Sequence, residues 1–319
     1  MKIIIKLLDL FFLMRPILFI PVWGFAYIGF FSSVKTDSFF RTLFVQPENF
    51  LRSFILFSMF SLSVGAVNIL NQIIDYEVDS KNEGFPLLVK SNISIKQASI
   101  FAAIISLLSI IIPIIMGDYF VAVGSFLAIL IGLFYCLKPF YFTGRPFMDF
   151  VSNALGFGVV AFGVGWVVNG GGVDGFVKSS FAYFLLMSAG SISSTLPDIK
   201  GDRAEGKITT AVFFGINRAH LIATLLIVLA LIYSFTISDM LAVTSAVVSL
   251  PIYLLYILIK RESFMEATYK VGGGFLMVLI GLVYPYFLIP SIVVSLLTVI
   301  YFRVRFHVSY PSLMPTTES

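Results

Sequence analysis

Long apolar runs are the feature that most constrains this chain. A helix needs about 20 mostly apolar residues to cross the hydrocarbon core of a bilayer, and runs of this kind fill nearly all of the 319 residues. Pro285 and Pro290 either kink one long final helix or separate two shorter ones. We therefore predict an all-α fold, a polytopic membrane protein built as a bundle of nine or ten transmembrane helices. The predicted spans are 16–33, 53–71, 98–116, 120–137, 150–168, 181–196, 219–237, 241–259, 271–287 and 288–302.

Charge is scarce in this sequence. Charged residues make up 12% of the chain and hydrophobic residues 59%, whereas a soluble domain carries about 25% charged residues. This composition excludes a cytosolic enzyme, a nucleic-acid-binding module and a disordered protein. Cys136 is the single cysteine, which excludes an internal disulfide framework and a multi-thiolate metal site.

The N-terminal residues precede the first span. Lys2, Lys6 and Asp9 fall on one helical face, which predicts a short helix lying in the membrane interface. Arg15 interrupts the apolar run, and no small-residue cleavage site follows, so we expect the segment to be retained. The predicted organisation is an N-terminal interfacial segment 1–15, one transmembrane domain 16–305 and a C-terminal tail 306–319. Gly156, Gly158, Gly163 and Gly165 are expected to allow close helix contact.

Basic residues indicate the orientation of the predicted spans. Fifteen lie on the side of the N-terminus, and four, Lys35, Arg41, Arg52 and Lys178, lie on the other side. Ten spans would add Arg303 and Arg305 to the first group, and nine would add them to the second. Because loops rich in Lys and Arg face the cytoplasm, both counts predict a cytoplasmic N-terminal side.

Acidic residues gather in two short stretches. Seven of the 17 acids occur there: Asp75, Glu77, Asp79 and Glu83 after the second span, and Asp198, Asp202 and Glu205 after the sixth. Four crossings separate the two stretches. Since four is an even number, both must emerge on the same, cytoplasmic side of the membrane.

The spacing within these stretches indicates their chemistry. Asn71, Asp75 and Asp79 follow at steps of four, as do Asp198 and Asp202, so each set stacks on one helical face. Stacked carboxylates repel unless cations lie between them. Oxygen ligands of this kind suit Mg²⁺, which commonly bridges carboxylates to phosphate oxygens. Neighbouring bases that could complete a site for a magnesium diphosphate are Lys81, Lys138, Arg145, Lys200, Arg203 and Lys207.

At these residues the chain resembles the UbiA superfamily of intramembrane prenyltransferases. The family motif NxxxDxxxD occurs at 71–79, and DxxxD followed by Gly and Thr occurs in 198–209. Tyr135 and Lys138 match a third feature, a Tyr and a Lys at the end of the fourth span. The chain departs from many members at Gln72, where they carry Asp, and at Phe85-Pro86, where they carry Arg-Pro.

The resemblance implies transfer of an isoprenoid from a polyprenyl diphosphate donor to a lipophilic acceptor in the bilayer. It implies two Mg²⁺ ions, with Asp75, Asp79, Asp198 and Asp202 as metal ligands. Asn71 would support the first metal site, and Tyr135 would approach the reacting carbon or the leaving oxygen. The diphosphate would be held by Lys81, Lys138, Arg145 and Lys207. Acceptor class and donor length stay open; quinone precursors, ether lipids, tetrapyrroles and carotenoids all fit.

Two other functions are alternatives to a prenyltransferase. A secondary transporter also carries acids in its spans, but usually near the bilayer midplane on broken helices of inverted repeats. Here the acids follow span ends, and the two motif units share one orientation, which favours an internal parallel duplication. A catalytically lapsed membrane scaffold is the second alternative, and Gln72 and Phe85 are the only hints of it.

Overall fold

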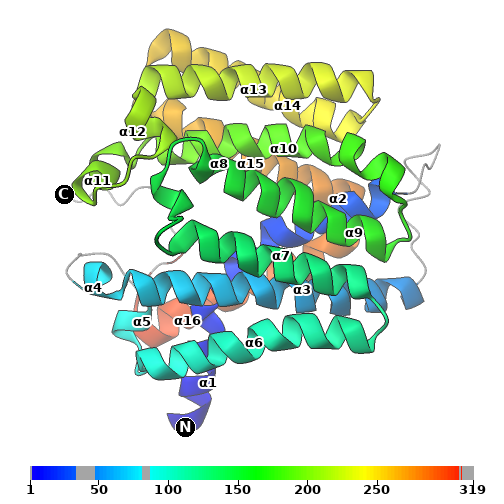
Figure 1. Ribbon diagram of the computed structural model, residues 1–319. Helices are drawn as coiled ribbons and strands as arrows, with labels where there is room; N and C mark the ends of the chain where they lie inside the picture. Colours follow the sequence, from blue (N-terminus) through cyan, green and yellow to red (C-terminus); the bar gives the residue numbers. More distant parts are fainter. Residues whose placement is uncertain (1, 34–46, 81–86, 309, 311–319) are drawn as a thin grey trace.

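The computed structural model describes residues 2–33, 47–80, 87–308 and 310, and within these ranges every regular element is a helix (Figure 1). The first half contains α1 (Lys2–Leu13), η1 (Pro16–Leu18), α2 (Phe19–Ser32), α3 (Pro47–Ile74), α4 (Tyr76–Asp79), α5 (Leu87–Lys90), α6 (Ile95–Ile115) and α7 (Tyr119–Cys136). The second half contains η3 (Phe142–Gly144), α8 (Met148–Ala154), the π-helical η4 (Leu155–Ala161), α9 (Phe162–Val168), α10 (Val173–Thr195), α11 (Ile199–Ala204), α12 (Thr210–Phe214), α13 (Ile216–Thr236), α14 (Met240–Ile259), α15 (Glu262–Val283), η5 (Pro285–Phe287) and α16 (Leu288–Phe306).

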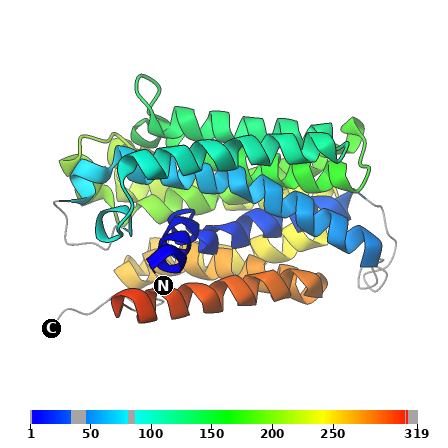
Figure 2. The ribbon, with the colours of Figure 1, turned by 90° about the horizontal axis from the view of Figure 1, so that it is seen from below.

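Eight helices in the described ranges are long and apolar enough to cross a membrane. They are α3, α6, α7, the continuous run α8–η4–α9, α13, α14, α15 and the run η5–α16. Helix α2 has only 14 residues, and α10 is rich in serine, so neither is among the eight. Both nevertheless run alongside the others in the bundle (Figures 1 and 2). The chain is thus an all-α polytopic bundle, and the count of nine or ten crossings stays a prediction.

A proline lies between the last two helices. Helix α15 ends at Val283, and Pro285 opens the short turn η5 before α16 begins at Leu288. Pro290 lies in the first turn of α16, where the missing N–H has no helical partner to lose. Of the two arrangements left open by the sequence, the structure therefore has two separate helices.

The outer faces of the helices are apolar. On α6, for example, Ile100, Ile104, Leu107 and Ile111 are all exposed, and they recur at helical spacing along one face. A soluble protein rarely leaves such a large apolar surface uncovered. These faces fit contact with lipid.

Glycines let helix backbones approach closely. A Cβ added to Gly165 of α9 would lie 1.7 Å from the carbonyl oxygen of Ala26 on α2, and one on Gly158 would meet the backbone of α10 at 2.8 Å. One on Gly163 would touch a phenylalanine ring at 3.0 Å. The expected close contacts are therefore present at these positions. The expectation for Gly156 is wrong, because a Cβ there would face open space.

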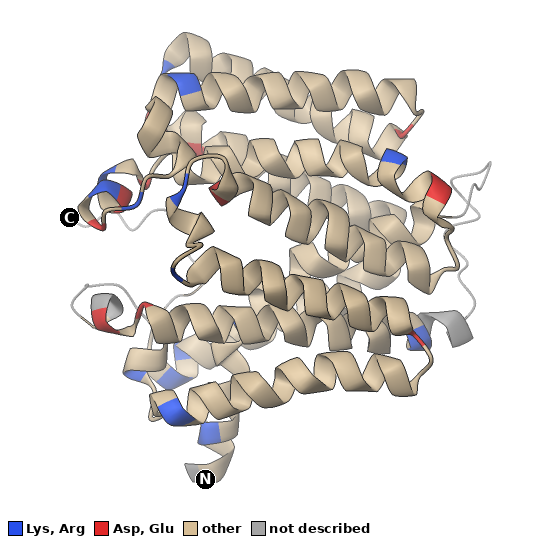
Figure 3. Ribbon diagram, viewed as in Figure 1, with Lys and Arg blue, Asp and Glu red and all other residues tan. Residues whose placement is uncertain are grey.

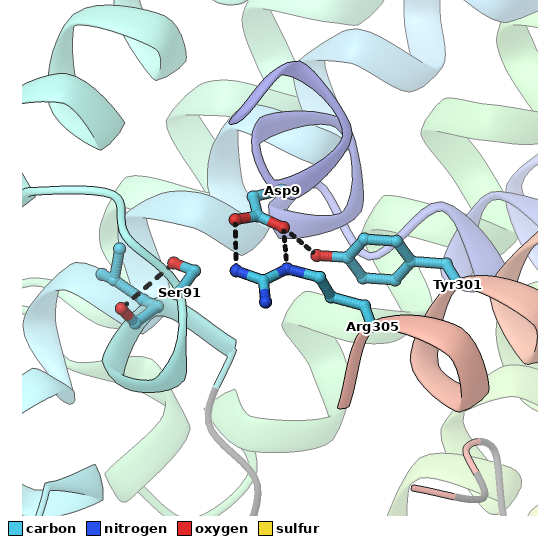
Figure 4. Close-up of polar contacts among 5 residues, drawn as sticks. Asp9, Ser91, Tyr301 and Arg305 are labelled. Atoms are coloured by element: carbon cyan, nitrogen blue, oxygen red, sulfur yellow. Dashed lines mark hydrogen bonds and ion pairs between the residues drawn. The ribbon is translucent and has the colours of Figure 1, made fainter. Parts of the chain in front are cut away.

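The first and last helices, α1 and α16, are joined by a buried acid (Figure 4). Asp9 of α1 is fully buried and accepts a hydrogen bond of 2.6 Å from the phenol of Tyr301 on α16. The Arg305 guanidinium lies 3.3 Å from the same carboxylate. A buried carboxylate requires such partners. The predicted helix at the N-terminus is present, but Asp9 faces the protein interior and not the membrane interface.

Candidate active site

Both acidic stretches lie at one end of the bundle. Asp75 follows the last residue of α3 and leads into α4, and Asp198 follows α10 and leads into α11. Figure 1 places α4 and α11 at the same end, and Figure 3 shows that Lys, Arg, Asp and Glu gather at the helix ends while the middle of the bundle carries almost none. The two motifs thus have the same local architecture, a long helix continued by a short one.

A chain of hydrogen bonds orders the first motif. The Asn71 side-chain amide donates to Oδ2 of Asp75 over 3.1 Å. Oδ1 of Asn71 in turn accepts from the Cys136 thiol over 3.3 Å. Asp79 is the last residue of α4, but its side chain lies outside the described part of the structure, as does the whole of Lys81.

The second motif is folded onto itself. The backbone N–H of Asp202 donates to the carbonyl of Asp198, and the backbone N–H of Lys207 donates to the carbonyl of Asp202, each over 2.8 Å. The Thr209 hydroxyl donates to the Asp202 carboxylate over 3.1 Å. Lys207 Nζ lies 2.7 Å from the Glu205 carboxylate. The helical turn of α11 and the loop after it therefore hold the carboxylates of Asp202 and Glu205 close to the ammonium of Lys207.

These charges change the pKa values of their neighbours. Partial burial raises the pKa of Asp198, and the charge of Asp202 raises it further. Partial burial also raises the pKa of Asp202, although Thr209 and Lys207 oppose this. Burial lowers the pKa of Lys207, but its hydrogen bond to Glu205 and nearby negative charges outweigh burial and leave that pKa above its usual value. Crowded acids beside a lysine form a site that favours added cations.

Tyr141 lies in the loop that contacts the second motif, where the backbone N–H of Ile208 donates to the carbonyl of Gly144 over 3.1 Å. The charges of Asp75 from the first motif and of Asp202 from the second both act on its phenol, together with that of Lys207. Burial raises the pKa of Tyr141, so the phenol keeps its proton at neutral pH and can donate. The ring packs on Gly144, where a Cβ would lie 2.6 Å from it. Sequence reasoning named Lys138 and Arg145 in this loop but missed Tyr141, which belongs to no motif.

The other predicted site residues lie on or beside the same loop. Lys138 is exposed, with its Nζ 5.9 Å from the ring centroid of Tyr141. Arg145 is also exposed and donates to the backbone carbonyl of Pro139 in its own loop. The Tyr135 phenol interacts with the side chains of Thr143 and Asn153. Lys207 and Tyr135 are thus partly enclosed, whereas Lys138 and Arg145 face outward.

A buried acid fastens this loop to the second motif. Asp149 of α8 is 3% exposed, and its carboxylate accepts from the Thr210 backbone N–H over 2.7 Å and from the Thr210 hydroxyl over 2.5 Å. The Thr210 hydroxyl also accepts from the backbone N–H of Phe147 over 2.8 Å. Asp149 thus satisfies the first backbone N–H of α12 and ties α8 to the segment after the second motif.

Of the two departures from the family pattern, Gln72 lies in the described part of the structure. Gln72 is 1% exposed, and its side-chain amide donates to the backbone carbonyls of Leu13 over 2.8 Å and of Asn68 over 3.0 Å. It therefore ties α3 to the end of α1. Phe85-Pro86 lies outside the described residues.

A cavity of about 670 Å³ adjoins the motif end of the bundle. Asn71, Tyr135 and Tyr269 line it on the side of the acids, and it extends between the two halves of the bundle toward Phe25 and Ala161. Most of the other lining residues are apolar. The charged end of the bundle thus opens onto a largely apolar cavity.

The donor set fits magnesium bound together with a phosphate group. Within the described residues no three Asp, Glu, His or Cys side chains converge as a complete metal cage. Mg²⁺ does not require one, since it commonly uses one or two carboxylates and completes its shell with water and substrate phosphates. Asp75 on one side and Asp198 with Asp202 on the other offer that kind of partial coordination.

Comparison with known proteins identifies relatives across most of the chain. The UbiA prenyltransferase family matches residues 42–271. The digeranylgeranylglyceryl phosphate synthase of Methanosphaera stadtmanae is 23% identical over 219 residues, which cover 66% of this chain and 78% of that protein. The protein of the same description from Methanocaldococcus jannaschii is 27% identical over 184 residues, which cover 58% of this chain and 62% of that protein.

Solved structures show the same fold. A UbiA homolog from Archaeoglobus fulgidus bound to GPP and Mg²⁺ superposes with a TM-score of 0.67 at 21% identity, over 90% of this chain and 99% of that one. A UbiA homolog from Aeropyrum pernix superposes with a TM-score of 0.59 at 18% identity, over 87% and 98% of the two chains. The helical bundle described above is therefore the fold of these proteins.

Proposed function

The chain belongs to the UbiA prenyltransferase family, and on that premise we propose that it transfers an isoprenoid chain from a polyprenyl diphosphate to a lipophilic acceptor inside the membrane in a Mg²⁺-dependent reaction. One observation carries this proposal. The two acidic motifs, at Asp75 and at Asp198 with Asp202, lie at the same end of the bundle beside a largely apolar cavity that Asn71 lines.

The metal would be held by the two motifs. Asp75 and Asp79 would hold one Mg²⁺, and Asp198 and Asp202 would hold the second. When bound, the ions would neutralise the charge that develops on the departing diphosphate. Asn71 orients Asp75 through its amide and so fixes the direction of that carboxylate.

Basic side chains and phenols would bind the diphosphate itself. Lys207 is the half-buried candidate next to the acids, and Lys138, Arg145 and Lys81 would add charge from the surrounding loops. Tyr135 and Tyr141 would donate hydrogen bonds to the oxygen that leaves with the diphosphate. Such donors matter most in a low-dielectric site, where removal of one commonly costs about 10²–10³ in rate.

The cavity would protect the reacting carbon from water. Loss of diphosphate from an allylic carbon leaves a carbocation, which water would quench. Phe25, Phe60 and Phe157 line the cavity, and the negative faces of aromatic rings tolerate a nearby cation. The remaining apolar walls would accommodate the prenyl chain.

The charge asymmetry supports a cytoplasmic location for the motif end. Fifteen of the 21 basic residues fall on that side by the predicted spans, and four on the other. Cytoplasmic loops are the ones enriched in Lys and Arg. A soluble diphosphate donor would therefore reach the site from the cytoplasm.

Reconstitution in lipid nanodiscs tests the proposal. The purified chain is supplied with labelled geranyl diphosphate, Mg²⁺ and a lipid extract of its source cells, and the expected result is label in a new lipid larger than free geraniol. Counterflow measured in liposomes tests the transporter alternative in parallel. Counterflow without prenyl transfer would contradict the proposal, and so would binding of the donor with no Mg²⁺-dependent product.

A further inference from the structure

The lining of the cavity is divided into two chemically different walls. Helices α2, α3 and α7 contribute mainly apolar side chains, such as Val22, Val64 and Ile131. The facing wall comes from α10, α14 and α15, which are neighbours in the bundle. Its hydroxyl residues, here termed the hydroxyl wall, are Ser191, Ser194, Ser245, Ser249, Tyr253 and Thr268.

The hydroxyl wall extends deep into the bundle. Ser249 lies ten residues before the end of α14 at Ile259, which is about 15 Å along the helix axis. The hydrocarbon core is about 30 Å thick, so the wall reaches from the motif end to the middle of the membrane. Polar side chains at that depth are costly and commonly mark a functional surface.

The hydroxyls retain capacity for a ligand. Ser249 and Thr268 donate to backbone carbonyls in their own helices, over 2.8 and 2.6 Å, which leaves their oxygens free to accept. The Tyr253 hydroxyl accepts from Ser193 over 3.1 Å, which leaves its proton to donate. Ser191 is 5% exposed, and its hydroxyl has no hydrogen-bond partner in the described structure.

Glycines keep space open along this wall. A Cβ added to Gly190 of α10, or to Gly273 or Gly274 of α15, would meet nothing within 4 Å, and all three residues line the cavity. At Gly272 a Cβ would lie 2.9 Å from the Ser249 hydroxyl. The glycines therefore leave room for a ligand in front of the hydroxyls.

The cavity lining is also uncharged. Among the described residues that line it there is no Lys, Arg, His, Asp or Glu. A phosphate or carboxylate placed against this wall would be buried without a counter-ion, which is strongly unfavourable. A neutral group that donates and accepts hydrogen bonds would be well matched.

We propose that the hydroxyl wall binds the acceptor, and that the acceptor is a neutral lipid bearing hydroxyl or carbonyl groups. This inference rests on the proposed function. In this arrangement the prenyl chain of the donor lies against the apolar side chains of α2, α3 and α7. The acceptor lies on the other side of that chain, where it contacts Ser191 and Ser249. A phosphorylated acceptor lipid is disfavoured.

A binding experiment tests the inference without turnover. The full chain in nanodiscs is saturated with Mg²⁺ and geranyl S-thiolodiphosphate, a donor analogue that ionises poorly, and then titrated with tritiated 1-O-hexadecylglycerol or its 3-phosphate. We expect the neutral probe to bind about tenfold or more tightly than the phosphate. A neutral probe that binds no more tightly than the phosphate overturns the inference. Absence of analogue binding would instead overturn the proposed function.

Two kinds of variant test whether the hydroxyl wall itself binds the neutral probe. Combining Ser191→Ala with Ser249→Ala should weaken binding of the neutral probe about tenfold, as expected for two lost hydrogen bonds, and leave binding of the donor analogue unchanged. Gly190→Val fills the hydroxyl side of the cavity, whereas Gly156→Val is a matched change at an equally open lining position in η4, outside the hydroxyl wall. We expect the first to affect the glycerol probe and the second to affect the donor analogue. Equal effects of the two valines on both ligands contradict the division of the cavity.

Discussion

The Cys136 thiol donates a hydrogen bond to Oδ1 of Asn71 over 3.3 Å. Because the oxygen of Asn71 is held in this way, its NH₂ group points to Asp75, to which it donates over 3.1 Å. Cys136 therefore acts as a positioning residue for the first motif acid. The relationship joins the end of α7 to the end of α3.

Removing the thiol should weaken catalysis modestly. For Cys136→Ala we expect kcat/KM to fall about 2- to 10-fold, the equivalent of one neutral hydrogen bond, because Asn71 loses the contact that fixes its orientation. Cys136→Ser keeps a donor at the same place and should retain most of the activity. Steady-state prenyl transfer measures both, and equal loss in the two variants would argue against a positioning role.

The Thr209 hydroxyl should set the affinity of the second motif for Mg²⁺. It donates to Asp202 over 3.1 Å, so Thr209→Val removes a charge-assisted hydrogen bond and should raise the Mg²⁺ concentration at half-maximal activity about tenfold. Thr209→Ser is the control, since it keeps the hydroxyl. Thr209 also caps α12 by accepting from Val212, so thermal unfolding is measured alongside. A variant that lowers only stability, with unchanged Mg²⁺ dependence, would refute the prediction.

Apparent Mg²⁺ affinity should depend on pH. The pKa values of Asp198 and Asp202 lie above the usual value, which is about 3.9 for an exposed aspartate. Protons therefore compete with the metal at higher pH than they would at an exposed aspartate, and affinity should fall as pH is lowered through those raised pKa values.

A single substitution should move this pH dependence. The charge of Glu205 raises the pKa of Asp202, and Glu205 also pairs with Lys207. Glu205→Gln removes the negative charge that raises the pKa of Asp202 and also frees Lys207, whose positive charge lowers that pKa. The pKa of Asp202 should therefore fall, and the midpoint of the Mg²⁺ affinity profile should shift to lower pH. Titration of Mg²⁺ at a series of pH values gives the midpoint, and a shift to higher pH would contradict the assignment.

The packing of α2 on α9 gives a prediction for stability. A Cβ on Gly29 would lie 1.9 Å from the carbonyl oxygen of Phe162, so Gly29→Ala must force the two backbones apart. Overpacking typically costs about 1–3 kcal/mol, and we expect thermal unfolding at a lower temperature. Gly274→Ala, at a position with open space, is the control and should unfold at or above the wild-type temperature. An unchanged Gly29→Ala variant would show that the contact is loose.

Much of the fold could be predicted because membrane helices are marked by composition. The span predicted at 120–137 corresponds to α7, Tyr119–Cys136, and the one at 241–259 to α14, Met240–Ile259. The burial of Asp9 could not be predicted, because its partners Tyr301 and Arg305 lie almost the whole chain away in sequence. Local periodicity does not reveal such distant pairing.

The site was only partly predictable for a similar reason. Asn71, Asp75, Asp198 and Asp202 stand out through their spacing in an acid-poor sequence. Tyr141 does not, because it reaches the motifs through a turn in which its own φ is 45°, and no spacing rule marks that conformation. Asp149 pairs with Thr210 across 61 residues, and the hydroxyl wall is assembled from three helices, so neither is visible in one stretch of sequence.

The central claim is that the two carboxylate motifs act together on one diphosphate. Release of diphosphate from labelled geranyl diphosphate, measured with Mg²⁺ in nanodiscs for the wild type, Asp75→Asn, Asp202→Asn and the double variant, tests it most directly. We expect each single variant to lose about 10²–10³ in rate. The double variant should lose less than the product of the two single losses, because residues that act as a unit are not additive. Near wild-type release in both single variants would contradict the account.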